Sequence, residues 1–247
     1  MSGRIPDRFV RFPVNFQTWE YLTFLHWSYD PATIQALVPK ELTVQQWDGK
    51  TWVGITPFRM TDVRLPGLPA LPSWRSFPEL NIRTYVRTAD GPDGIWFLGL
   101  LVPLLSFSAA ACSIGLPYQR SSSQISVDGS HWKYRFDTPH PRQLTHHDWF
   151  TASVEVGEPL AEADRTPWLE SVTGRWTAFH QRAGILWGTP VYHEPWELYA
   201  ASTVGNLTAP LRWAVCRNPK TSRSCTHPIR CTPGSVCLGG RRFTVAV

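Results

Sequence analysis

The stretch FPELNIRTYVR, residues 77–87, alternates apolar and polar side chains over its length. Successive side chains of a β-strand point to opposite faces of the sheet. One face would carry Leu80, Ile82, Thr84 and Val86, and the other Glu79, Asn81, Arg83, Tyr85 and Arg87. The alternation therefore predicts a strand of an antiparallel sheet that packs its apolar face on the core.

The polar face of this strand has two interpretations. It is either a solvated surface, which is common in antiparallel sheets, or the wall of an internal cavity. In a cavity, burial would raise the pKa of Glu79, so that this side chain could act as an acid or a base. Arg83 could then hold a carboxylate in a bidentate pair. Alternation alone does not decide between the two.

The segments on either side of this strand predict a β-rich α+β protein. Turn sequences such as DGK (48–50), ADGPDG (89–94) and DGS (128–130) separate strand-like runs, and 42–65 is predicted as a hairpin around DGK. Helices are expected over 30–39 and over 164–181, the second with Asp164 as its N-cap. Runs of strands interrupted by few helices favour a mostly antiparallel sheet, and the 13 tryptophans favour a closed or cone-like one.

Residues 95–116, IWFLGLLVPLLSFSAAACSIGL, are the one stretch long and apolar enough to suggest a membrane span. Pro103 and three serines interrupt the stretch, and neither flank carries an anchoring charge. We therefore predict a buried strand followed by a helix, and no membrane partner.

The excess of positive over negative charge lies at the C-terminal end of the chain. The formal net charge is +5, but seven of the 24 basic residues and none of the 19 acidic residues lie after residue 211. Residues 1–211 are therefore slightly acidic, which argues against nucleic-acid binding by this part of the chain.

Cysteine usage follows the same division. Cys112 is the one cysteine before residue 212, whereas Cys216, Cys225, Cys231 and Cys237 follow it at spacings that match no paired zinc motif. With no signal-peptide pattern at the start, one body cysteine favours a reducing, cytoplasmic location. No metal and no cofactor is expected. His140, His146 and His147 are interpreted as surface residues.

Two further short segments draw attention. GLPYQ, residues 115–119, is in the simplest interpretation a turn after a helix, with Gly115 as its cap. VYHEPWEL, residues 191–198, contains His193 and Trp196, which are either a packed core pair or part of a cavity wall.

Taken together, several segments resemble one family. FLHWSYDP, DGKTWVGITPFRM, VRLPGLP, FPELNIRTYVR, DGPDGIWFLGL, GLPYQ and VYHEPWEL occur in this order and spacing in the YqjF-like proteins, an uncharacterised bacterial group. The resemblance covers about residues 15–211. This group in turn looks like a distant branch of the acetoacetate-decarboxylase-like superfamily. The resemblance implies a double-layered antiparallel β-cone or barrel with a central cavity and a few helices.

The resemblance also implies roles for individual residues. Glu79 falls where the superfamily enzymes carry an inward glutamate, so it is the expected catalytic acid or base. The expected substrate-binding residues are Arg83, Asn81, Tyr85, Tyr118, His193 and Trp196. The Schiff-base lysine of those enzymes follows a Gly-Phe-Pro turn, whereas GLPY places Tyr118 there. Since imine formation requires an amine, a Schiff-base acetoacetate decarboxylase is not expected.

The resemblance ends near Val215. One possible set of codons for VCRNPKT (215–221) reads Gly-Leu-Pro-Glu-Pro-Glu-Asp, as in relatives, if one G is placed before it. We therefore predict one domain over 1–211 and a poorly ordered, atypical tail over 212–247, of which about 215–247 are an out-of-frame translation. The rival interpretation is a genuine basic, Cys-rich tail that binds an anion or a metal.

The expected function is binding of a small carboxylate or carbonyl compound in a buried cavity, with or without catalysis. The alternative is a non-catalytic binding or scaffold protein of the same fold. Self-association into a homo-oligomer is left open.

Overall fold

The structure, a computed structural model, describes residues 3, 5–6, 10–89, 91–139, 147–216, 235–238 and 243–246. The strands are β1 (Phe16–Glu20), β2 (Thr23–Tyr29), β3 (Thr43–Val44), β4 (Thr51–Arg64), β5 (Ser76–Arg87), β6 (Asp93–Val102), β7 (Tyr118–Arg120), β8 (Ser123–Asp128), β9 (His131–Pro139), β10 (His147–Pro159), β11 (Thr177–Arg182), β12 (Ile185–Pro190), β13 (Tyr192–His193), β14 (Leu198–Val204), β15 (Ser235–Leu238) and β16 (Phe243–Ala246). The helices are α1 (Pro31–Gln35), α2 (Leu105–Ser113), α3 (Pro167–Thr173) and α4 (Ala209–Cys216), with the short 3₁₀ helices η1 (Pro72–Trp74) and η2 (Glu162–Asp164).

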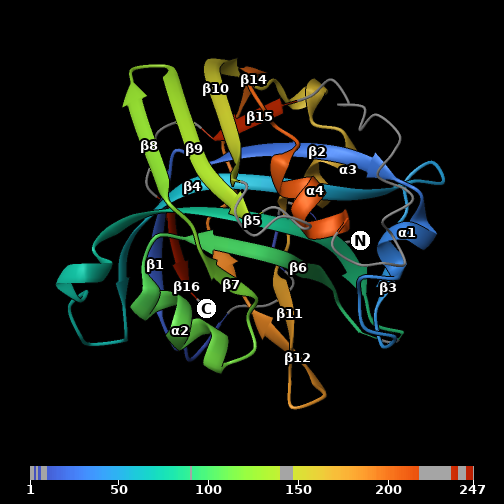
Figure 1. Ribbon diagram of the computed structural model, residues 1–247. Helices are drawn as coiled ribbons and strands as arrows, with labels where there is room; N and C mark the ends of the chain where they lie inside the picture. Colours follow the sequence, from blue (N-terminus) through green and yellow to red (C-terminus); the bar gives the residue numbers. More distant parts are fainter. Residues whose placement is uncertain are drawn as a thin grey trace.

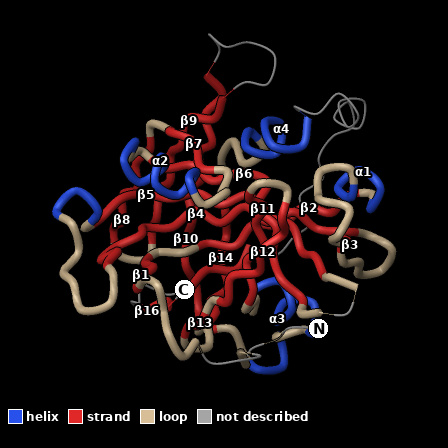
Figure 2. The backbone as a smooth tube through the Cα atoms, turned by 90° about the horizontal axis from the view of Figure 1, so that it is seen from below, coloured by secondary structure: helices blue, strands red, loops and turns tan. Residues whose placement is uncertain are grey.

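The strands form one continuous, folded-over sheet (Figure 1). Its main path runs β12-β11-β6-β5-β4-β2-β15-β14-β10-β9-β8, and β1, β3, β7, β13 and β16 pair off this path. Most pairs are antiparallel, and β6 pairs in parallel with β7 and β11. In Figure 1, β8, β9 and β10 cross the direction of β4, β5 and β6, so the sheet makes two layers. The helices lie around the margin of the strands (Figure 2). The predicted β-rich α+β class and double-layered sheet are confirmed.

The main hydrophobic core lies between the two layers. One wall comes from β2, β4 and β5, with Leu25, Trp27, Val53, Ile55, Leu80, Ile82 and Val86. The facing wall comes from β9 and β10, with Trp132, Tyr134, Phe136, Phe150, Ala152 and Val154. The apolar face of β5 therefore packs where the alternation predicts.

The polar face of β5 is buried as well. β5 pairs with β4 along one edge and β6 along the other, so the strand lies inside the sheet. Glu79, Asn81 and Arg83 are 2%, 4% and 5% exposed. Three polar side chains at this depth must find partners or line a cavity, because unpaired burial of polar groups is costly.

The apolar stretch 95–116 divides into β6 and α2, as predicted. A helix of the length and apolarity needed to cross a membrane is not found in the part of the chain that the structure describes.

Three predicted elements differ from the structure. The helix predicted over 30–39 is α1, which ends at Gln35. β3 does not form a hairpin with β4, although Trp47 and Lys50 form a bridge around the DGK turn. β3 instead pairs with Val86 and Arg87 of β5, because β5 extends past the start of β4 and leaves that edge open.

The helix predicted over 164–181 is much shorter. Asp164 ends η2, and the N-cap of α3 is Thr166, whose Oγ1 accepts a hydrogen bond from the Leu169 N–H at 3.2 Å. α3 ends before Gly174, where any Cβ would lie 2.3 Å from the carbonyl oxygen of Gly3. Residues 177–182 then form β11.

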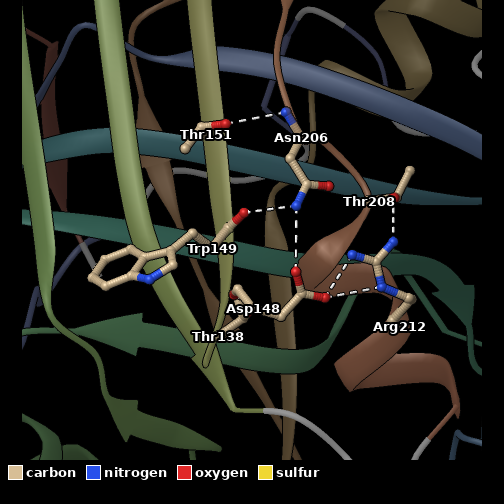
Figure 3. Close-up of polar contacts among 7 residues, drawn as sticks. All are labelled: Thr138, Asp148, Trp149, Thr151, Asn206, Thr208 and Arg212. Carbon is tan, nitrogen blue, oxygen red and sulfur yellow. Dashed lines mark hydrogen bonds and ion pairs between the residues drawn. The ribbon is translucent and has the colours of Figure 1, made fainter. Parts of the chain in front are cut away.

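A cluster of polar side chains joins helix α4 to strand β10 (Figure 3). Asp148 Oδ2 accepts from Arg212 Nε at 2.9 Å and Nη2 at 2.5 Å. Asn206 Nδ2 donates to Asp148 Oδ1 at 3.3 Å and to the Trp149 carbonyl at 2.9 Å. Arg212 also donates to Thr208 Oγ1 at 2.7 Å. Charge-assisted bonds of this kind hold an element in place against the sheet.

The predicted boundary at residue 211 falls within α4. Beyond it, β15 pairs with β14 and β2, and β16 pairs with β1 and β13. His140, His146, Cys225 and Cys231 lie outside the described residues, and the structure gives only the backbone of His147. The interpretation of this end of the chain as an out-of-frame tail stays a prediction.

Candidate functional site

A cavity of about 620 Å³ lies on the polar side of β5. Its walls come from β1, β4 and the loop that follows it, η1, β5, β6, α2, β7, the end of α3 and the residues after it, and β11 to β13. Six of the seven residues predicted as site residues line it: Glu79, Asn81, Arg83, Tyr118, His193 and Trp196. Pockets of this size commonly hold small molecules. The cavity is therefore the candidate site.

Glu79 is the buried carboxyl group of this cavity. Tyr118 donates its hydroxyl proton to Glu79 Oε1 at 3.1 Å, and Oε2 has no hydrogen-bond partner among the described residues. Burial raises the pKa of Glu79 to about 8, although the bond from Tyr118 works in the opposite direction. The carboxyl group is thus mostly protonated at neutral pH, and it can donate a proton as well as accept one.

Tyr118 is held in the protonated state by its burial and by the contact with Glu79. Burial and the adjacent Glu79 raise the pKa of Tyr118 well above its usual value. Its ring lies edge-on to Phe107 of α2, with ring centroids 5.3 Å apart. Tyr118 therefore serves Glu79 as a fixed donor.

Arg83 is a buried cation on the same face of β5 as Glu79. Its Nη2 donates to the Val172 carbonyl at 3.0 Å, and its guanidinium lies over the rings of Phe24 and Tyr85 at 5.2 and 5.7 Å. Nε of Arg83 and Oδ1 of Asn81 have no hydrogen-bond partner among the described residues. The buried Nε–H of Arg83 can donate to an anionic oxygen, whereas Oδ1 of Asn81 can accept a hydrogen bond from an N–H or O–H group of a ligand.

His193 forms an aromatic stack in the wall. Its ring lies between Trp196 and Trp176, with centroid distances of 3.7 and 4.2 Å. Nδ1 is 2.6 Å from the Glu194 carbonyl oxygen, which can only accept, so Nδ1 carries the proton. Burial lowers the pKa of His193 to about 4, and Arg83 adds to this shift. The ring is therefore neutral near pH 7, with Nε2 as an acceptor.

Tyr85 lies next to the cavity and does not line it. Its hydroxyl is 2.6 Å from Nε2 of His26. Burial lowers the pKa of His26 to about 3, with a further contribution from Arg83. Tyr85 thus contacts both His26 and the guanidinium of Arg83, and it holds Arg83 in place from outside the cavity.

Arg175 lines the cavity and was missed by sequence reasoning. It donates to Ser171 Oγ at 2.8 Å, and its Nη1 lies 3.8 Å from Asp93 Oδ2. Its guanidinium also lies over the rings of Tyr85 and Trp47. The available signal was a single arginine in the otherwise uncharged run 171–179, but the predicted helix over 164–181 gave no reason to place it at a site.

The described lysines lie away from the cavity. Lys40, Lys50 and Lys133 are exposed, and Lys220 lies outside the described residues. Groups of three or more side chains suited to hold a metal ion are also not found in the described parts of the chain.

Most of this chain matches one protein family. The family model DUF2071, described as an uncharacterized conserved protein, matches residues 16–228. The chain belongs to the DUF2071 family. The DUF2071 chain is also 32% identical over 188 residues to the uncharacterized protein YqjF of Bacillus subtilis (strain 168), with 75% of each sequence covered.

The solved structures similar to this DUF2071 protein share its fold. An acetoacetate decarboxylase-like enzyme from Sphingomonas wittichii RW1 matches with a TM-score of 0.59 and 11% identity, covering 98% of this chain and 95% of that one. The enduracididine biosynthesis enzyme MppR, complexed with pyruvate, matches with a TM-score of 0.56 and 12% identity, covering 97% and 90%. The acetoacetate-decarboxylase-like fold implied by the sequence is thus confirmed.

Proposed function

We propose that this protein binds a small carboxylate or carbonyl compound in the cavity beside β5. One observation carries the proposal: Glu79 Oε2 and Arg83 Nε are buried in one cavity and lack partners among the described residues. A ligand that is both an anion and a hydrogen-bond acceptor would satisfy both groups. MppR, which shares the fold, has pyruvate bound, and this supports the same class of ligand.

We further propose that Glu79 acts as a general acid or base on the bound compound. With its pKa near 8, the group can both give and take a proton close to neutral pH. Arg83 would hold the anionic end, together with Asn81, Tyr118, His193 and Trp196 in the wall. Tyr85 would act through Arg83, because it lies under the guanidinium and outside the cavity lining.

The second candidate is a protein that binds its ligand without turnover. It is favoured by Tyr118, which stands where the resemblance places the Schiff-base lysine and which donates to Glu79. This arrangement keeps a carboxyl group in place and provides no amine nucleophile.

A ligand screen separates these candidates. Keto acids and simple carboxylates would be tested by thermal shift with the wild type, Glu79→Gln and the surface control Glu158→Gln. An enzyme would consume a stabilising compound, while Glu79→Gln would bind it and leave it unchanged. If wild type and variant both bind and neither consumes it, the non-catalytic candidate holds. If no compound raises the melting temperature, the binding proposal fails.

Borohydride trapping tests the absence of a Schiff base. We expect that borohydride with acetoacetate leaves the mass of the protein unchanged, because the described lysines are remote from the cavity. A covalent adduct would overturn this interpretation of Tyr118.

We also infer a cytoplasmic location and no nucleic-acid partner. These inferences rest on the single cysteine and the slightly acidic balance of residues 1–211.

A further inference from the structure

The cavity beside β5 has two chemically different ends. Glu79 and Arg83 are 2% and 5% exposed, whereas five large apolar residues that line the same cavity are 47% to 64% exposed. These five form what we call the apolar rim: Val14, Leu65, Leu68, Leu71 and Ile114. The cavity thus leads from a buried polar end to an apolar opening at the surface.

The rim gathers residues from three distant segments. Val14 precedes β1, the three leucines belong to the loop between β4 and η1, and Ile114 follows α2. Single exposed apolar residues are normal, but a group of them around one opening marks a binding surface. Other strongly exposed apolar side chains, such as Val204, do not line the cavity.

The wall between the two ends is also apolar. Met60 and Val63 of β4, Phe107 of α2 and Leu116 before β7 all line the cavity. Arg64 is a charged residue beside this wall, and it is ion-paired with Asp62. An apolar chain could therefore pass from the polar end to the rim without burying an unpaired charge.

The volume of the cavity exceeds the needs of a very small acid. A keto acid of about seven non-hydrogen atoms would fill roughly a third of the 620 Å³, if each atom takes about 30 Å³ as water does in the liquid. The remainder is bounded mainly by apolar side chains.

We propose that the ligand is an amphiphilic carboxylate, with its head at Arg83 and Glu79 and an extended apolar chain that reaches the apolar rim. This inference rests on the proposed function, since it uses the same polar end. It adds the class of compound: an acid with a medium-length alkyl or aryl chain, of which the rim contacts the far part.

A chain-length series tests the inference. Straight-chain saturated acids of about four to ten carbons would be titrated into the full-length protein by calorimetry, below their micellar concentrations. We expect Kd to fall by about fourfold for each added methylene that is buried. Primary alcohols of equal length should bind more weakly, because they lack the anionic head.

Matched variants locate the chain. Leu68→Asp places a charge in the exposed rim, and Val204→Asp places one at a comparably exposed position outside the cavity. We expect Leu68→Asp to weaken the ten-carbon acid at least tenfold and to leave the four-carbon acid unchanged. Val204→Asp should change neither.

The outcomes separate this inference from the proposed function. If acids of all lengths bind equally well, the extended chain is refuted and the carboxylate site stands. An equal length dependence in wild type and Leu68→Asp would place the chain elsewhere and overturn the inference. If the length series is flat and the wild type binds neutral phospholipid vesicles while Leu68→Asp does not, the rim is a membrane-contacting surface. If no acid binds at any length, the carboxylate site itself fails.

Discussion

Glu79 couples the candidate site to the stability of the fold. Its pKa is about 8 in the folded protein and ordinary in the unfolded chain, so folding favours its protonated form. A group with a raised folded pKa stabilises the protein fully below the unfolded pKa. That stabilisation is lost as pH rises through the folded pKa.

Glu79→Gln should remove this dependence on pH. Between about pH 6 and pH 8 the wild type should lose roughly 2 to 3 kcal/mol of unfolding free energy relative to Glu79→Gln. Urea denaturation across this range measures the difference, with Glu158→Gln as a surface control. Parallel curves for wild type and Glu79→Gln would contradict the raised pKa.

The buried histidines act in the opposite direction. His26 and His193 have pKa values lowered to about 3 and about 4, so the stability they contribute is lost as pH falls below their unfolded pKa near 6.5. Together with Glu79, they predict that the unfolding free energy is greatest at about pH 6.5.

Tyr118→Phe should raise the pKa of Glu79 further. The hydroxyl of Tyr118 donates to the carboxyl group and lowers its pKa, so its removal leaves only the effect of burial. The pH at which the stability of the variant levels off should therefore lie higher than in the wild type. Carbon NMR of the Glu79 carboxyl group reports the same shift directly, and a lowered pKa would refute the role of Tyr118.

At the scale of elements, the strands were predictable and their neighbours were less so. The alternation in 77–87 identified β5, and the turn sequences at 89–94 and 128–130 identified two of the hairpins. Alternation shows only that the two faces of a strand differ, and it does not show what covers each face. The burial of Asn81 and Arg83 was therefore open until the resemblance supplied a cavity.

Segment 164–181 shows where local signals compete. Asp164 and Thr166 both have N-cap chemistry, and the sequence does not tell which one begins the helix. Arg175 was missed as a cavity residue because the predicted helix included it, whereas α3 ends at Thr173. Leu65 and Leu68 of the rim lie in VRLPGLP, one of the segments that carry the family resemblance, but the sequence of this segment does not reveal which cavity it borders.

Exchanging each cap candidate for alanine tests the boundary of α3. Thr166→Ala should cost about 1 kcal/mol of unfolding free energy, because the Leu169 N–H loses its acceptor. Asp164→Ala should cost clearly less, since its side chain lies in η2 and is exposed. Thermal and urea unfolding of the two variants measure this, and the reverse order would restore Asp164 as the cap.

For the whole molecule, the open question is the authenticity of about residues 215–247. The pairing of β15 and β16 shows that these segments adjoin the sheet, while residues 217–234, between α4 and β15, lie outside the described part. The proposal of an out-of-frame tail rests on the abrupt change in charge and cysteine content.

Sequencing the coding DNA decides this proposal. We expect codons for residues 215–221 that read Gly-Leu-Pro-Glu-Pro-Glu-Asp after insertion of one G. Codons incompatible with that alternative frame would establish the tail as genuine. Mass spectrometry of the intact protein for bound zinc would then test the rival interpretation.

The position of β5 also bears on how quickly the site responds to a ligand. Its backbone is paired along both edges and covered on both faces, so its amides should be among the slowest to exchange with deuterium. Glu79 and Arg83 would then be held in position before any ligand arrives. Binding at the polar end should accordingly proceed with little loss of conformational entropy, as in a preorganised receptor.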